Sequence, residues 1–209
     1  MTGPEPATGA APGLVGRPEQ PGPPRTAPVR PADLDPERRA LHALIADGPR
    51  RAQARVPLVD DEGRLLGPFG LMLLSPRIGA AVQAVGAALR FDEDLPPRLR
   101  ELAVLMVAAA TGSGFEWAAH EQAALAAGAD QGQLQDVLDG RLPAGLEPAE
   151  LAGLRVVQAL LDRHGLDDES YAEARTALGE PGLAAVVWLV GYYEMLATAL
   201  ATFRPPPPA

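Results

Sequence analysis

Apolar residues recur at intervals of three and four along most of this chain, which is the period of an amphipathic helix. Two of the expected helices start with an N-cap residue followed by proline at the first helical position, at Asp35-Pro36 and Ser75-Pro76. Further cap residues and glycines divide the rest of the chain into helices. Their expected ranges are 97–111, 115–127, 131–138, 147–163, 167–178 and 181–202. Because no segment reads as a convincing strand, we expect an all-α fold, a bundle of about eight helices.

Two stretches differ from this pattern. Residues 56–74 are apolar but lack a helical period, so we expect an irregular segment that forms a pocket wall or an interface. Residues 102–110 are apolar all round, which predicts the most buried helix of the core. The helix before them has one apolar face, formed by Ile78, Val82, Val85 and Leu89.

The chain divides into a core and two proline-rich ends. Residues 1–33 hold nine prolines and few apolar groups that could repay the cost of ordering, so we predict a disordered arm. Residues 34–203 are expected to form a single helical domain, and 204–209 a proline-rich tail. Segment 182–203 is long and apolar enough to span a bilayer, but Glu194 lies inside it and no basic cluster flanks it. We favour a buried core or interface helix there, and expect a cytoplasmic protein with no membrane partner.

Composition excludes several classes of chemistry. The chain has 39 alanines but two isoleucines, which favours helix over sheet. Its net charge of −9 argues against nucleic acid as a partner. The absence of cysteine excludes disulfides, thiolate metal sites and thiol redox chemistry, and the absence of lysine excludes a Schiff-base lysine. With three histidines and no second one in helical register, we predict no metal site.

One group of ionisable residues could carry acid–base chemistry. Glu116 and His120 are four apart on an expected helix, so their side chains meet on one face. A carboxylate beside an imidazole raises its proton affinity and fixes its orientation, although a solvated ion pair would show the same spacing. Glu101 either points across to this pair and shares its proton, or serves the helix N-terminus and pairs with Arg98.

These residues occur in an order that resembles the carboxymuconolactone decarboxylase superfamily, which includes the alkylhydroperoxidase D-like proteins. The resemblance covers roughly residues 67–203. Its motifs are Leu-Pro-Pro-Arg-Leu-Arg-Glu (95–101), an apolar helix, a glycine-rich break, Phe-Glu-Trp-Ala-Ala-His (115–120), Ala-Ala-Gly (126–128) and Gly-Tyr-Tyr (191–193). The resemblance implies a helical fold of this family's type and assembly as a homotrimer or hexamer.

The peroxidase branch of that family combines a glutamate, two cysteines and a histidine. Carried over to this sequence, the glutamate falls on Glu101 and the histidine on His120, whereas the two cysteine positions fall on Ser113 and Glu116. Both redox sulfurs are therefore missing, and a dithiol peroxidase cycle cannot run.

The decarboxylase branch, which uses no metal or organic cofactor, is the better match. It implies a lyase with catalytic residues His120, Glu116 and Glu101, in which His120 acts as the acid, Glu116 orients and charges it, and Glu101 completes the relay. Candidate substrate-binding residues are Phe69, Arg98, Trp117, Tyr192 and Tyr193. Each has an alternative reading, an ion pair for Arg98 and ordinary packing for the aromatic residues.

We therefore expect a cofactor-independent acid/base enzyme that decarboxylates or isomerises a small carboxylated or lactone-like metabolite. The alternative is a non-catalytic oligomeric helical scaffold that binds a ligand or partner. Burial distinguishes them, because a catalytic Glu116 and His120 should be enclosed and a structural pair should be solvated.

Overall fold

The computed structural model describes residues 16–19, 22–48, 57–91 and 93–206, and within them the fold is all-α. It contains eight α-helices, a short 3-10 helix η1 (Pro31–Asp33) and a single isolated antiparallel bridge between Val59 and Leu65. The helices are α1 (Pro36–Ala46), α3 (Gly67–Met72), α4 (Pro76–Arg90), α5 (Pro97–Thr111), α6 (Gly114–Ala126), α7 (Gln131–Leu138), α8 (Pro148–Arg163) and α9 (Asp168–Phe203). The all-α prediction is confirmed.

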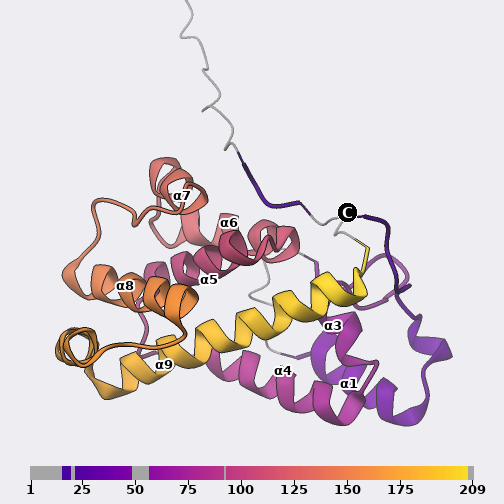
Figure 1. The fold of residues 1–209 in the computed structure, drawn as a ribbon. Helices are drawn as coiled ribbons and strands as arrows, with labels where there is room; N and C mark the ends of the chain where they lie inside the picture. The colour runs from indigo at the N-terminus through magenta and orange to yellow at the C-terminus, as the bar shows by residue number, and fades with distance from the viewer. Residues whose placement is uncertain (1–15, 20–21, 49–56, 92, 207–209) are drawn as a thin grey trace, which may run out of the picture.

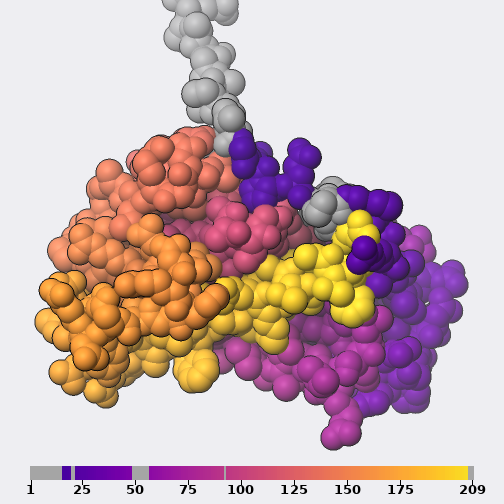
Figure 2. Space-filling model, viewed as in Figure 1, coloured from indigo at the N-terminus to yellow at the C-terminus, as the bar shows by residue number. Residues whose placement is uncertain are grey.

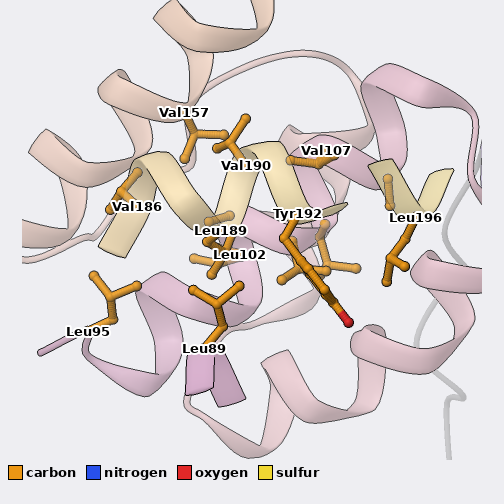
Figure 3. Packing of buried hydrophobic residues seen from close by; sticks show 14 of the residues in the cluster. Leu89, Leu95, Leu102, Val107, Val157, Val186, Leu189, Val190, Tyr192 and Leu196 are labelled. Atoms are coloured by element: carbon orange, nitrogen blue, oxygen red, sulfur yellow. The ribbon is translucent and has the colours of Figure 1, made fainter. Parts of the chain in front are cut away.

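Helix α5 lies at the centre of the fold, as the apolar run 102–110 predicts. It contacts α6, α7, α8 and α9, and eight of its residues are buried. Helix α9 runs the length of the molecule, with α5 to α8 on one side and α1, α3 and α4 on the other (Figure 1). The core forms where α9 meets α4, α5 and α8, and Figure 3 shows Val186, Leu189 and Val190 of α9 facing Leu102 and Val157.

The segment 67–72 is helical, so the expectation that 56–74 stays irregular is wrong for this part. Pro68 lies in the first turn of α3, where its missing N–H costs no hydrogen bond. Gly67 has φ 54°, and a Cβ there would lie 2.1 Å from Cζ of Phe115. The helix therefore starts at a position that only glycine can occupy, and its shortness hides the helical period from sequence analysis.

Helix α4 turns two glycines inward, together with Gln83 and Leu89. Gly79 and Gly86 are buried, whereas Ile78 is 65% exposed and Val85 is also exposed. A Cβ at Gly79 would lie 2.2 Å from the carbonyl oxygen of Met72, so α3 and α4 approach more closely than side chains would allow. The apolar stripe of α4 consequently remains partly on the surface.

The described part of the N-terminal segment, within the arm predicted to be disordered, contacts the C-terminal end of α9. The backbone N–H of Arg25 donates to the carbonyl of Arg204 (3.0 Å), its guanidinium to the carbonyl of Thr202 (2.9 Å), and the hydroxyl of Thr26 to the carbonyl of Phe203 (3.2 Å). These donors satisfy carbonyls at the C-terminus of α9 that have no partner within the helix. Figure 2 shows this indigo segment against the yellow end of α9. The part of the prediction that concerns residues 1–15, 20 and 21 falls outside the described residues.

The two helices expected over 167–178 and 181–202 are both present and meet at a kink within α9. At their junction, Gly179 has φ 70° and ψ 169°, a combination that is open essentially to glycine alone. Helix α9 is the one described helix whose length and hydropathy would suit a membrane span, and half of its most apolar stretch is buried inside the fold.

Candidate functional site

Three helices bring four ionisable side chains together. Glu101 comes from the second turn of α5, Glu116 and His120 from successive turns of α6, and Tyr193 from the C-terminal half of α9. Helix α5 ends at Thr111, and the left-handed conformation of the next residue, Gly112 (φ 68°), reverses the chain, so that α6 packs back along α5. This reversal places His120 beside Glu101, although 19 residues separate them.

His120 has a partner at each ring nitrogen. Its Nδ1 lies 2.7 Å from Oε2 of Glu101, and its Nε2 lies 3.3 Å from the hydroxyl of Tyr193 and 3.6 Å from Oε2 of Glu116. The rings of His120 and Tyr193 meet edge to face, with centroids 5.2 Å apart. Because an ionised carboxylate only accepts hydrogen bonds, Nδ1 carries a proton and donates it to Glu101.

The cluster is enclosed by the fold. Glu101 and Glu116 are each 3% exposed and His120 is 9% exposed, while Tyr193 is half-buried. Burial of this degree differs from the solvated ion pair that the spacing of Glu116 and His120 would also allow. Ionisable groups held together away from water are typical of sites that move protons.

Glu101 is surrounded by positive charge. Arg90 Nη1 donates to its Oε1 at 3.1 Å, and Arg100 Nε lies 3.6 Å from the same oxygen. Burial alone would raise the pKa of Glu101, but the hydrogen bond from His120 and the charges of His120, Arg90 and Arg100 together lower the pKa below 4.5. Glu101 is therefore an ionised carboxylate at neutral pH.

The geometry reverses the expected division of labour between the two glutamates. Glu101, and not Glu116, makes the short hydrogen bond that orients the imidazole. Sequence spacing favoured Glu116 because it is a helical neighbour of His120, whereas the contact with Glu101 depends on how α5 and α6 pack. Arg90, at the end of α4, is a member of the cluster that sequence reasoning missed; its place in the last turn of a helix gives it no distinguishing pattern.

Several of the expected substrate-binding residues have other partners in the structure, and their role in binding stays a prediction. Arg98 donates to both carboxylate oxygens of Glu150, through Nε at 2.9 Å and through Nη2, so its ion-pair reading fits the structure. Trp117 is buried and donates from Nε1 to Glu121 at 3.1 Å, and Phe69 packs against the core. Among the five, Tyr193 contacts the cluster, through its hydroxyl and ring against His120.

Tyr192 lines a different feature, a groove between α4 and α9. This α4–α9 groove encloses about 620 Å³ and is lined mainly by apolar side chains, among them Val85, Trp188, Tyr192 and Met195. Trp188 is 68% exposed. The rings of Tyr192 and Tyr193 meet edge to face, with centroids 5.2 Å apart. Tyr192 lines the groove and the next residue, Tyr193, contacts His120, so the groove and the cluster are neighbours.

The described part of the chain holds no group of three or more His, Cys, Asp or Glu side chains that could hold a metal ion. The buried hydroxyl of Ser113, at the start of α6, has no hydrogen-bond partner among the described residues. Ser113 is the residue that stands at the first cysteine position of the peroxidase motif.

Comparison with known proteins agrees with this fold. Residues 76–159 match the model of the Carboxymuconolactone decarboxylase family, a segment that contains Glu101, Glu116 and His120. No curated protein matches the sequence. Two solved structures of the debrominase Bmp8, the apo protein and a cysteine-to-alanine variant in complex with 2,3,4-tribromopyrrole, are similar to the whole fold with a TM-score of 0.65 each and 14% identity. Each alignment covers 87% of this chain, and 90% of the variant or 91% of the apo protein.

Proposed function

Because residues 76–159 match the model of the Carboxymuconolactone decarboxylase family, we propose that this protein is a cofactor-independent acid/base enzyme acting on a small carboxylated or lactone-like metabolite. The proposed reaction is decarboxylation or isomerisation. The residues proposed to carry it are His120, Glu116 and Glu101.

The observation that carries the proposal is the buried contact between His120 and Glu101. The ionised carboxylate of Glu101 lies 2.7 Å from Nδ1 of His120 and holds the orientation of the imidazole. Loss of CO₂ leaves a carbanion or dienolate, which needs a positioned acid and a site poor in water. His120 is the proposed acid, and Glu116 lies on the far side of its ring, with Oε2 3.6 Å from Nε2.

Thiol chemistry is not part of the proposal. The chain contains no cysteine, so neither a peroxidase cycle nor any reaction that consumes a thiolate of this chain is available. The likeness to Bmp8 is a likeness of fold at 14% identity, and it supports the helical framework and not a debromination reaction.

The experiment is a turnover assay on carboxymuconolactone and a panel of related lactone acids and β-keto acids, in which the release of CO₂ is measured. His120→Asn should lower kcat by about 10²–10⁴-fold, the usual loss when a general acid is removed. His164→Asn is the matched control, because His164 is exposed and has φ 56°, a conformation that asparagine tolerates. Equal kcat values in the two variants would show that His120 takes no part in the reaction.

A non-catalytic scaffold is the second candidate, and the α4–α9 groove is the observation that favours it. If no compound of the panel turns over while the wild-type protein binds an apolar ligand in the groove, the scaffold takes precedence.

We also propose that the protein forms a homotrimer or hexamer through the exposed faces of α4 and α9. Ile78 and Trp188 are 65% and 68% exposed and large apolar side chains of this kind gather over two neighbouring helices, which is typical of an interface. Light scattering after size-exclusion chromatography should give about three or six times 21.8 kDa for the wild type. Trp188→Glu should dissociate it, and Leu44→Glu, on the exposed side of α1, should not. A monomeric wild type would contradict the proposal.

A further inference from the structure

We propose that Tyr193 is a catalytic residue, the group that hands the proton of His120 to the substrate. The inference deepens the proposed function and rests on it. It starts from the fact that both nitrogens of the imidazole already have partners: Nδ1 contacts Glu101, and Nε2 contacts Tyr193 and Glu116.

The two ring nitrogens of His120 make hydrogen bonds of unequal length. The bond to Glu101 is short, at 2.7 Å, and its acceptor is nearly fully buried, so the Nδ1 proton stays in place. The contact to Tyr193 is longer, at 3.3 Å, and weaker by its geometry. A proton that leaves the imidazole therefore leaves from Nε2, on the side that Tyr193 occupies.

Tyr193 is also less buried than Glu101 and Glu116, the other residues that contact His120. Glu101, Glu116 and His120 are buried, whereas Tyr193 is half-buried. In the proposal, a small molecule approaches from the side of Tyr193, the less buried residue, and meets the phenol before the imidazole. A tyrosine hydroxyl both accepts and donates a hydrogen bond, so it can receive one proton while it gives up another.

The proton balance of the step is complete without a cofactor. His120 begins as the imidazolium, with Nδ1–H donating to Glu101 and Nε2–H donating to the Tyr193 oxygen. When CO₂ has left, the Tyr193 O–H bond breaks and a C–H bond forms on the substrate carbanion, while the Nε2–H bond breaks and a new O–H bond forms on Tyr193. The imidazole ends neutral, Glu101 stays ionised, and one proton from solvent restores the starting state. The net change is that a carboxylate and a proton become CO₂ and a C–H bond.

Tyr193→Phe tests this role, because it removes one oxygen and keeps the ring that packs against His120 and Tyr192. Tyr171→Phe is the matched control, since Tyr171 is exposed on the N-terminal half of α9. With carboxymuconolactone as the probe, Tyr193→Phe should lower kcat by about 10²-fold or more and change KM by less than about threefold. Tyr171→Phe should match the wild type.

A second readout needs no substrate. In ¹⁵N-histidine spectra, the Nε2 resonance of His120 should move in Tyr193→Phe and stay unchanged in Tyr171→Phe, with His42 and His164 as internal references. Reciprocally, the ¹³Cζ resonance of Tyr193 should move in His120→Asn, which provides the same test if Tyr193→Phe does not fold.

The outcomes separate the two proposals. Wild-type kcat in Tyr193→Phe, alongside a loss in His120→Asn, would overturn the role of Tyr193 and leave the proposed function standing. Unchanged His120 and Tyr193 resonances would overturn the contact itself. A wild-type protein that turns over none of the lactone acids or keto acids would overturn the proposed function, and the catalytic role of Tyr193 with it, even if the resonances show the contact.

Discussion

Replacing Glu101 by glutamine removes the charge on which the cluster is built and changes its shape little. The carboxylate takes a hydrogen bond from His120 at 2.7 Å and from Arg90 at 3.1 Å, with Arg100 at 3.6 Å. A neutral amide leaves the two guanidinium groups facing each other without their shared anion. We therefore expect Glu101→Gln to destabilise the fold as well as to abolish the proposed relay.

The size of the effect follows from the exposure of the partners. Removing one member of a fully buried ion pair costs about 3–5 kcal/mol. The side chains of Arg90 and Arg100 are 18% and 16% exposed, so water compensates part of the loss, and we expect the lower end, about 3 kcal/mol. For a domain of this size, that corresponds to a fall in Tm of roughly 6–12 °C.

Urea unfolding at several pH values measures this contribution. Because folding lowers the pKa of Glu101, its ionised form stabilises the native state above its ordinary pKa of 4.5, and this stabilisation is lost as the pH falls through the lowered value. Glutamine does not titrate, so the gap between variant and wild type should be full at pH 7 and narrow at strongly acidic pH. Glu173→Gln, at an exposed position of α9, is the control and should stay within about 0.5 kcal/mol of the wild type. A Glu101→Gln protein as stable as this control at pH 7 would refute the description of Glu101 as the anion at the centre of a buried cluster.

Three further predictions concern other contacts. Arg98→Ala should lower the free energy of unfolding by about 2 kcal/mol through loss of its charged hydrogen bonds to Glu150, with KM unchanged; a raised KM would instead restore Arg98 as a substrate-binding residue. Gly153→Ala should cost about 1–3 kcal/mol in urea unfolding, because the added Cβ would lie 2.7 Å from both Cδ atoms of Leu99; a neutral effect would show that α5 and α8 can separate freely. Arg25→Ala should lower Tm by a few degrees, since its guanidinium supplies about 0.3–1 kcal/mol at the carbonyl end of α9, and an unchanged Tm would mean that the segment does not hold that end.

Much of the helical framework is readable from short-range signals. Asp35 accepts from the N–H of Arg38, as an N-cap residue should, and Asp130 and Gln133 form a reciprocal capping box at α7. The central position of α5 follows from its uninterrupted apolar residues. Such features need only a few consecutive positions, which is why they could be predicted.

The site is formed by contacts between residues that are far apart in the sequence, and no local sequence pattern predicts such contacts. His120 and Tyr193 are 73 residues apart, and their contact requires α6 and α9 to lie on the same side of α5. The pair Arg98 and Glu150 spans 52 residues, and without it Arg98 looked available to a substrate. The inward face of α4 was likewise hidden, because the buried residues Gly79 and Gly86 carry no hydrophobic signal.

The hydrogen bond between Arg25 and Arg204 brings two distant parts of the sequence to one corner of the molecule. Circular permutation becomes feasible under this condition, because a short linker could join residue 206 to residue 22 without crossing the fold. New ends could open at Gly145, in the exposed loop between α7 and α8. In such a chain, α8 and α9 would precede α5 and α6, so Tyr193 would come before Glu101 and His120 in the order of synthesis. The same three side chains would then come together in a chain with the opposite order of these helices. A permutant that still places them in contact would show that the site depends on how the helices pack and not on the order in which they are connected.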